Sequence, residues 1–252
     1  SSSIEFVDGG PGTLYFATAE GLFKTTGFPG LGTTVLVDPA ATVTGIQEME
    51  LFGSNLMFQA NDAAGYTNGG IPVGIELLQF NGTQIVLAAD IRNGASSSSP
   101  KGMTTFGSKM YFQANNGISG TELWSWDGVM AAGTDLNTAS SSSPVGFYVH
   151  SGKMFFSADV SNAIDTDIGR ELCVHDGTTL TKIDLWPGPA NGLGTIPAFT
   201  GMTPNKVCFL ANDGTTGTEL FETDGTAANT INCVDLQPGT SAGGRDTLGV
   251  NT

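Results

Sequence analysis

Acidic side chains in one stretch of the sequence are spaced so that a loop could bind a hard cation. The stretch from Asp159 to Glu171 reads DVSNAIDTDIGRE and places Asp165 and Asp167 two residues apart, shortly before Gly169. Ca²⁺ takes about six to eight oxygen ligands, and alternating carboxylates before a glycine let a loop wrap around one ion, although the full EF-hand signature is missing. We therefore predict Ca²⁺ as a cofactor, with an ordinary solvated acidic loop as the alternative. The predicted metal ligands are Asp159, Asp165, Asp167 and Glu171.

Two further sets of carboxylates recur along the chain, one within Glu-Leu pairs and one at the ends of short apolar runs. Nine Lys and Arg residues stand against 24 Asp and Glu residues, so most of these groups cannot form ion pairs. Carboxylates at strand ends commonly accept hydrogen bonds from backbone N–H groups of the following turn. We predict this capping role, at about 1 kcal/mol per unit. The sets are Glu76, Glu122, Glu171 and Glu219, and Asp38, Asp90, Asp135, Asp184 and Asp235.

Motifs of known catalytic machinery are absent from the sequence. The two histidines, His150 and His175, each lie alone in a predicted strand, without a Gly-x-Ser-x-Gly motif, zinc-ligand spacing or a phosphate-binding loop. Glycoside hydrolysis needs carboxylates that converge on the scissile bond. Asp8, Glu48 and Glu50, on predicted first strands, are the evident inward-facing candidates, and they do not recur with the repeat. We therefore predict no catalytic residues and a protein that is not an enzyme.

Aromatic residues offer a sugar-stacking platform as an alternative to packing. The candidates are Trp124, Trp126, Trp186 and Tyr148. Because side chains alternate along a strand, Trp124 and Trp126 share one face with Glu122. This arrangement favours packing between neighbouring units.

Composition restricts the partners and the cysteine chemistry. The formal net charge of −15 repels phosphate backbones, so nucleic-acid binding is excluded, whereas divalent cations and an extracellular setting fit such a surface. No run of 18 apolar residues exists, which excludes a membrane-spanning helix. Cys208 and Cys233 have one predicted strand between them, beyond disulfide reach. With Cys173 they are expected to be buried free thiols, and Asn81-Gly82-Thr83 is a glycosylation sequon.

The strands and turns that position the candidate residues are predicted from a sequence unit that repeats along the chain. The clearest copies are KMYFQANNGISGTELWSWDG at 109–128 and VCFLANDGTTGTELFETDGT at 207–226. The Glu-Leu pairs begin at 76, 122, 171 and 219, at intervals of 46, 49 and 48 residues, which is typical of repeat architectures.

Each unit reads as four short strands. In the third unit we expect strands at 102–106, 110–114 and 122–126 and a fourth that ends near 136, with Asp127-Gly128 as a hairpin turn. Asn81-Gly82, Asp176-Gly177 and Asp224-Gly225 take the same place in other units. The serine tracts that end at Pro100 and Pro144 are interpreted as ordered crossovers. The first unit lacks the middle loop, and the second carries an enlarged loop at 61–74.

These units predict an all-β protein with a single repeat domain over 1–252. The units span about 4–44, 45–101, 102–145, 146–196 and 197–252. Four strands in about 45–50 residues is the size of a propeller blade, so a five-bladed β-propeller of four-stranded antiparallel blades is the favoured fold. An open β-solenoid or a fragment of a longer repeat array is the alternative. Residues 247–252 fall at the phase of a first strand and are expected to pair across the closure or onto a neighbouring molecule.

The motifs Ala-Asn-Asp-Gly, Gly-Thr-Glu-Leu and Asp-Gly-Thr, followed by Asp-Leu and Pro-Gly, resemble the ELWxxDGT repeat family, which is hyalin-repeat-like. The resemblance covers about 45–240 well and 4–40 faintly. It implies propeller-like domains of secreted or cell-surface proteins, often adhesins, without catalytic residues to transfer.

Together these observations predict an extracellular, non-enzymatic adhesion, assembly or ligand-binding propeller module, stabilised by Ca²⁺. The expected partner is a surface polysaccharide, an extracellular matrix or another copy of the chain. The alternative function is a carbohydrate-active enzyme, a glycoside hydrolase or lyase, that uses the propeller channel.

Overall fold

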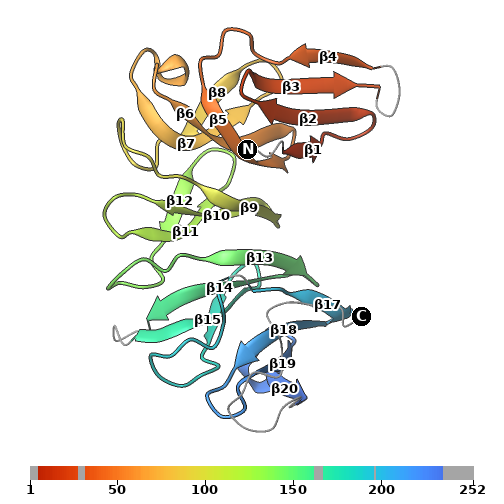
Figure 1. Cartoon of the computed structure of the whole chain (residues 1–252), viewed down its shortest axis with the longest axis vertical. Helices are drawn as coiled ribbons and strands as arrows, with labels where there is room; N and C mark the ends of the chain where they lie inside the picture. Colours follow the sequence, from red (N-terminus) through yellow and green to blue (C-terminus); the bar gives the residue numbers. More distant parts are fainter. Residues whose placement is uncertain (1–4, 28–31, 162–166, 196, 235–252) are drawn as a thin grey trace, which may run out of the picture. The chain divides into compact units, whose positions relative to one another are not determined.

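Strands dominate the fold. The computed structural model describes residues 5–27, 32–161, 167–195 and 197–234 (Figure 1), and the only helices among them are two short 3-10 turns, η1 (Tyr66–Asn68) and η2 (Ala227–Asn229). The predicted strand pairing of 247–252 lies outside the described residues. No helix in the described part of the chain is long and apolar enough to cross a membrane.

Within the described residues twenty strands form five sheets, and in each sheet every strand is antiparallel to the strand that precedes it in the chain. Sheet 1 contains β1 (Phe6–Asp8), β2 (Thr13–Thr18), β3 (Gly21–Thr26) and β4 (Thr33–Leu36). Sheet 2 contains β5 (Thr44–Phe52), β6 (Asn55–Asp62), β7 (Val73–Phe80) and β8 (Ile85–Ala89). Sheet 3 contains β9 (Lys101–Phe106), β10 (Lys109–Asn115), β11 (Thr121–Trp126) and β12 (Ala131–Thr134).

Sheet 4 contains β13 (Val145–His150), β14 (Lys153–Ser161), β15 (Asp167–His175) and β16 (Leu180–Ile183). Sheet 5 contains β17 (Thr200–Thr203), β18 (Lys206–Asn212), β19 (Thr218–Thr223) and β20 (Ile231–Val234). The prediction of an all-β chain with five four-stranded antiparallel units is confirmed. Contacts along the chain divide it into two compact units, Ser1–Thr134 with sheets 1 to 3 and Asp135–Thr252 with sheets 4 and 5.

The Asx-Gly pairs of sheets 2 to 4 form the hairpin turns after the third strands, as predicted, whereas in sheet 5 the pair Asp224-Gly225 opens a longer connection that contains η2. Asp127 Oδ1 accepts hydrogen bonds from the N–H groups of Val129 at 2.9 Å and Met130 at 2.8 Å, and Gly128 has φ 99°. Asp176 repeats this arrangement in sheet 4. The backbone hydrogen bonds hold the pKa of both aspartates below the usual value, led by the N–H of Met130 for Asp127.

One correction concerns the enlarged loop of the second unit. The prediction placed it at 61–74, whereas β6 continues to Asp62, β7 begins at Val73 and η1 lies between them. Asp62 is fully buried and anchors this segment, because its carboxylate accepts hydrogen bonds from the N–H groups of Tyr66 at 2.8 Å and Thr67 at 2.7 Å. The loop is therefore shorter and more regular than the sequence indicated.

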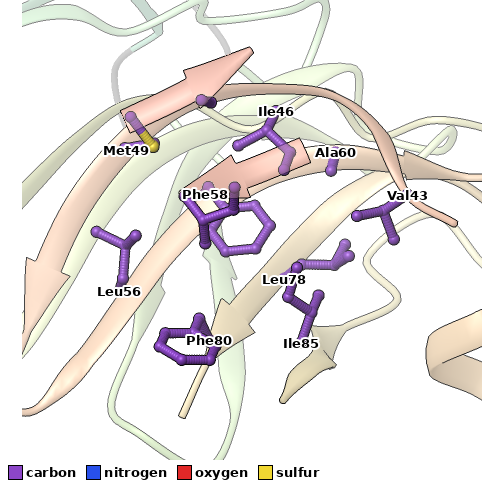
Figure 2. Close-up of a cluster of buried hydrophobic side chains, with 11 residues drawn as sticks. Val43, Ile46, Met49, Leu56, Phe58, Ala60, Leu78, Phe80 and Ile85 are labelled. Carbon is purple, nitrogen blue, oxygen red and sulfur yellow. The ribbon is translucent and has the colours of Figure 1, made fainter. Parts of the chain in front are cut away.

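Apolar side chains on facing sheets supply the core. Figure 2 shows one cluster, in which Ile46, Phe58 and Leu78 of sheet 2 gather, and Ala17 and Leu22 of sheet 1 belong to the same cluster. Sheets 2 and 3 meet in a second cluster, and sheets 4 and 5 meet in a third. Each sheet thus buries at least one face against a neighbour, as units of a repeat architecture must. The second cluster contains Met57, Leu77, Met110, Phe112, Ala114 and Trp126.

The first strands of sheets 2 to 5 carry bulges. In β9, β13 and β17 the pairing register with the second strand shifts once, near Gly102, Gly146 and Met202 respectively. In β5 it shifts twice, between Thr44 and Gln47 and again between Gln47 and Glu50. A bulge bends a strand and redirects its side chains, so β5 differs from its counterparts where it carries Glu48.

Candidate functional site

The four recurring glutamates of the third strands are buried, and two of them, Glu76 and Glu171, clamp backbone N–H groups of the following crossover. Glu76 and Glu171 have no solvent exposure. Glu76 Oε2 accepts hydrogen bonds from Ile91 N at 2.9 Å and from the Ser98 hydroxyl at 2.5 Å, and Oε1 accepts Ser98 N at 2.8 Å. Glu171 likewise accepts hydrogen bonds from the backbone N–H groups of Leu185 at 2.8 Å and Gly192 at 2.6 Å. The predicted capping role is confirmed for both.

Each clamp also reaches the next sheet through one residue of the crossover. Ser98, held by Glu76, accepts a hydrogen bond at its carbonyl oxygen from Asn115 N at 2.9 Å, at the end of β10. Gly192, held by Glu171, accepts one from Asn212 N at 2.8 Å, at the end of β18. The serine tract around Ser98 is therefore an ordered connection, as predicted.

Burial sets the protonation of the clamp carboxyls. Desolvation raises the pKa of Glu76, and the bonds from Ser98 and Ile91 oppose the rise. Desolvation likewise raises the pKa of Glu171 to about 8, and the hydrogen bonds from the N–H groups of Leu185 and Gly192 oppose this rise. The carboxyl groups of Glu76 and Glu171 therefore have a structural role and are not exposed to solvent.

Two of the fourth-strand aspartates, Asp38 and Asp90, also accept backbone N–H groups, and Asp38 does so across two sheets, whereas Asp235 lies outside the described residues. Asp38 follows β4 of sheet 1, and its Oδ2 accepts Ile85 N of sheet 2 at 2.8 Å. The Tyr66 hydroxyl lies 3.0 and 2.9 Å from the two oxygens of Asp38. Sequence reasoning did not identify Tyr66, because the contact joins residues 28 positions apart. Asp90 caps its own turn through Gly94 N at 3.1 Å, as predicted.

The residues predicted to bind Ca²⁺ are engaged in other contacts where the structure describes them. Asp159 forms an ion pair with Arg170 at 2.5 Å, and Asp167 accepts Gly169 N at 2.8 Å. Both oxygens of Glu171 are used by the crossover. Asp165 lies outside the described residues. Within the described ranges no three His, Cys, Asp or Glu side chains are grouped so that they could hold a metal ion.

The first-strand carboxylates of sheets 1 and 2 form a different group. Asp8 Oδ1 accepts a hydrogen bond from the backbone N–H of Gly10 at 2.9 Å, which stabilises the turn between β1 and β2. Glu48 and Glu50 both extend from β5 to β9: Glu48 Oε2 accepts Gly102 N at 2.8 Å, and Glu50 contacts the backbone and side chain of Thr105. The structure thus brings two of the three candidates to one neighbouring strand.

Glu48 and Glu50 differ in environment. Glu48 has φ 57°, in the left-handed region that non-glycine residues rarely occupy, and it lies in the second bulge of β5. Such backbone costs of the order of 1 kcal/mol or more and is concentrated at functional sites. Glu50 is half-buried, and desolvation raises the pKa of its carboxyl. A carboxyl with a raised pKa retains its proton to higher pH, as a general acid requires.

The histidines and most of the aromatic candidates are structural. His150 Nε2 bonds with the Thr203 carbonyl oxygen at 2.8 Å, and His175 Nδ1 accepts Gly177 N at 2.9 Å. Trp126 is buried between sheets 2 and 3, with Trp124 packed against the same cluster. Tyr148 packs between sheets 4 and 5. Packing between neighbouring units, as predicted, is confirmed for these three aromatic residues.

Comparison with known proteins supports a β-propeller. No family model and no curated protein matches the chain. Among solved structures it is similar to puromycin hydrolase, with a TM-score of 0.54 and 15% identity over 92% of this chain and 38% of that one. It is also similar to a putative TolB from Agrobacterium tumefaciens, with a TM-score of 0.43 and 12% identity over 91% and 80% of the two chains. A GH74 xyloglucanase from Xanthomonas campestris has a TM-score of 0.43 and 12% identity over 88% and 36%.

The five four-stranded sheets and the similarity to puromycin hydrolase define the class of fold: the chain is all-β and built from the four-stranded blades of a β-propeller. It spans 38% of the length of puromycin hydrolase. The prediction that the protein is not an enzyme is contradicted, because a hydrolase shares its fold. The prediction relied on missing linear motifs, and a propeller can assemble a site from residues that are distant in the sequence, which no linear motif records.

Proposed function

We propose that the chain is the propeller part of a carbohydrate-active hydrolase in which Glu48 and Glu50 face the substrate. The observation that carries the proposal is the left-handed backbone of Glu48, with φ 57°, in a bulge that β9, β13 and β17 lack. Strained backbone next to a carboxylate pair is a device that aims side chains at a ligand.

Two carboxyl groups are the minimum machinery of glycoside hydrolysis. One protonates the departing glycosidic oxygen, and the other activates water or attacks the sugar carbon. Glu50 suits the first role because burial raises the pKa of its carboxyl. Glu48 suits the second because its carboxyl group is held in place by the backbone N–H of Gly102.

The setting of the pair supports a polymeric glycan as substrate. The first strands β5 and β9 are tied side by side, since the Thr105 hydroxyl donates to the Leu51 carbonyl oxygen at 3.1 Å. In a propeller the blades surround a central channel, to which sugars can be admitted from one face. A net charge of −15 disfavours phosphate-rich polymers and fits an extracellular polysaccharide.

The test is release of reducing ends from a panel of neutral polysaccharides that includes xyloglucan and arabinan. The parent protein is expected to release product, and Glu48→Gln and Glu50→Gln are each expected to reduce the rate at least about 100-fold. Glu20→Gln, at an exposed turn of sheet 1, is the control and should retain full activity. Equal rates for all four proteins, or no product from any polysaccharide with folded parent protein, would refute the proposal.

A further inference from the structure

Three sulfur atoms gather on one face of sheet 5. The Cys208 thiol of β18 lies against Met202 Sδ of β17. It also contacts the Cys233 thiol of β20. The Cys233 thiol in turn contacts the Glu222 carboxylate of β19. Residues from all four strands of sheet 5 thus lie close together, although the first of them, Met202, and the last, Cys233, are 31 positions apart in the sequence.

Two bulges bring these side chains together. The register between β17 and β18 shifts between Gly201 and Thr203, at Met202. The register between β19 and β20 shifts between Leu220 and Phe221, where Cys233 falls between the paired residues Asn232 and Val234. Bulges redirect individual side chains without moving the whole strand. Each flanking strand thereby turns a sulfur towards Cys208.

The two thiols belong to strands β18 and β20, which have β19 between them. The distance between the backbones of these two strands decides whether the thiols can form a disulfide. Cys208 pairs with Glu222 of β19, which lies between β18 and β20. Strands two places apart are separated by about 9–10 Å. A disulfide needs Cα atoms about 4.4–6.8 Å apart, so the pair cannot form one without backbone movement. Consistently, both cysteines are free.

A metal ion can join sulfur atoms whose backbones are too far apart for a disulfide. Metal–sulfur bonds of about 2.3 Å separate two ligating sulfur atoms by about 3.8–4 Å, and the side chain of Met202, 56% exposed, has room to adjust. Thiolate and thioether ligands together select Cu(I) over harder ions. We propose that Cys208, Cys233 and Met202 form a site for one Cu(I) ion on sheet 5.

Charge balance and access agree with this assignment. Uptake of Cu⁺ by two thiols releases two protons and leaves a complex of charge −1, beside the Lys206 ammonium that is ion-paired with Glu222. Each thiol gives up its proton when it binds the ion, so copper uptake should strengthen as pH rises. Cys233 is exposed and Cys208 is buried, so the ion has a path from solvent to the inner ligand.

Titration of the reduced, anaerobic protein with Cu(I) in competition with bicinchoninate tests the site. The parent is expected to remove one equivalent of copper from the chelator, and X-ray absorption should show sulfur ligands only. Cys208→Ser and Cys233→Ser are each expected to weaken binding at least 100-fold, and Met202→Leu about 10-fold. Cys173→Ser, in sheet 4 and buried, is the matched control and should bind as the parent does.

Three results would overturn the assignment. The first is a parent protein that leaves all copper on the chelator. The second is copper binding that both serine variants retain while circular dichroism shows them folded. The third is nitrogen or oxygen ligation in the absorption spectrum. None of these outcomes depends on hydrolase activity, so the two proposals succeed or fail separately.

Discussion

Glu76 holds Ser98 by two hydrogen bonds, one from the backbone N–H at 2.8 Å and one from the hydroxyl at 2.5 Å, although the residues lie 22 positions apart. The carbonyl oxygen of Ser98 accepts Asn115 N of the next sheet. Through this single crossover residue, a carboxylate of sheet 2 is linked to the end of β10 in sheet 3. The same relationship links Glu171, Gly192 and Asn212 between sheets 4 and 5.

Replacing Ser98 by alanine should weaken this connection. The variant loses a buried hydrogen bond to a carboxylate, which typically contributes about 1.5–3 kcal/mol, so we expect the free energy of unfolding to fall by about 2 kcal/mol. Urea denaturation measures it. Ser96→Ala, two residues earlier and exposed, is the control and should change stability by less than about 0.5 kcal/mol. Equal effects of the two substitutions would contradict the clamp.

The raised pKa of Glu171 makes stability depend on pH in a defined direction. Below about pH 4.5 both folded and unfolded chains carry the proton, whereas between about 4.5 and 8 the folded chain binds more protons. The contribution of this group to the free energy of unfolding therefore falls as pH rises through that window and is constant above it.

Glu171→Gln removes this titration, so the stability of the parent relative to the variant should decrease from pH 5 to pH 8. Chemical denaturation at several pH values measures the difference. Glu20→Gln, at an exposed position, should show no such trend. A parent advantage that grows with pH would mean that the bonds from Leu185 and Gly192 outweigh burial.

Gly177 tests the turn chemistry. Its φ of 95° is strained for any residue with a Cβ, although no atom lies within 4 Å of the Cβ position. Gly177→Ala should therefore destabilise the protein by about 1–2 kcal/mol through backbone strain alone. Gly194 also has open space but no positive φ, so Gly194→Ala is the matched control and should be near neutral. Thermal unfolding distinguishes the two.

Glu48 should show a conflict between stability and activity. Glycine at this position relieves the left-handed strain but loses the bond to Gly102, whereas alanine loses the bond and retains the strain. We expect Glu48→Gly to be more stable than Glu48→Ala by about 1 kcal/mol, with both variants inactive on polysaccharide. If Glu48→Gly retained parent activity, the carboxylate would have no part in the chemistry.

Local pattern predicted most of the fold. The Asx-Gly turns and the apolar runs indicated the strands closely, as at β11, expected at 122–126 and observed at Thr121–Trp126. Capping by Glu76 was predicted, since a recurring carboxylate with few cations must bind backbone donors. Its link to Asn115 was not, because that contact depends on how the crossover lies between two sheets.

Irregular backbone explains what the sequence did not indicate. The second bulge of β5 has no glycine to mark it, so the left-handed conformation of Glu48 left no signal. For Cys208 and Cys233, strand order indicated that no disulfide forms, which the structure confirms. The small, apolar character of a free cysteine suggested that both thiols are buried, but Cys233, on the edge strand β20 of sheet 5, is exposed.

The most direct test of the hydrolase account compares a polysaccharide with an aryl glycoside of the same sugar across pH. A nitrophenol leaving group needs little protonation, so Glu50→Gln should reduce polysaccharide cleavage at least about 100-fold while largely preserving aryl glycoside cleavage. The parent is expected to lose rate at high pH, and this loss should disappear in the variant, because Glu50 supplies the titrating proton. Equal loss on both substrates with an unchanged pH profile would contradict the assignment of Glu50 as the acid.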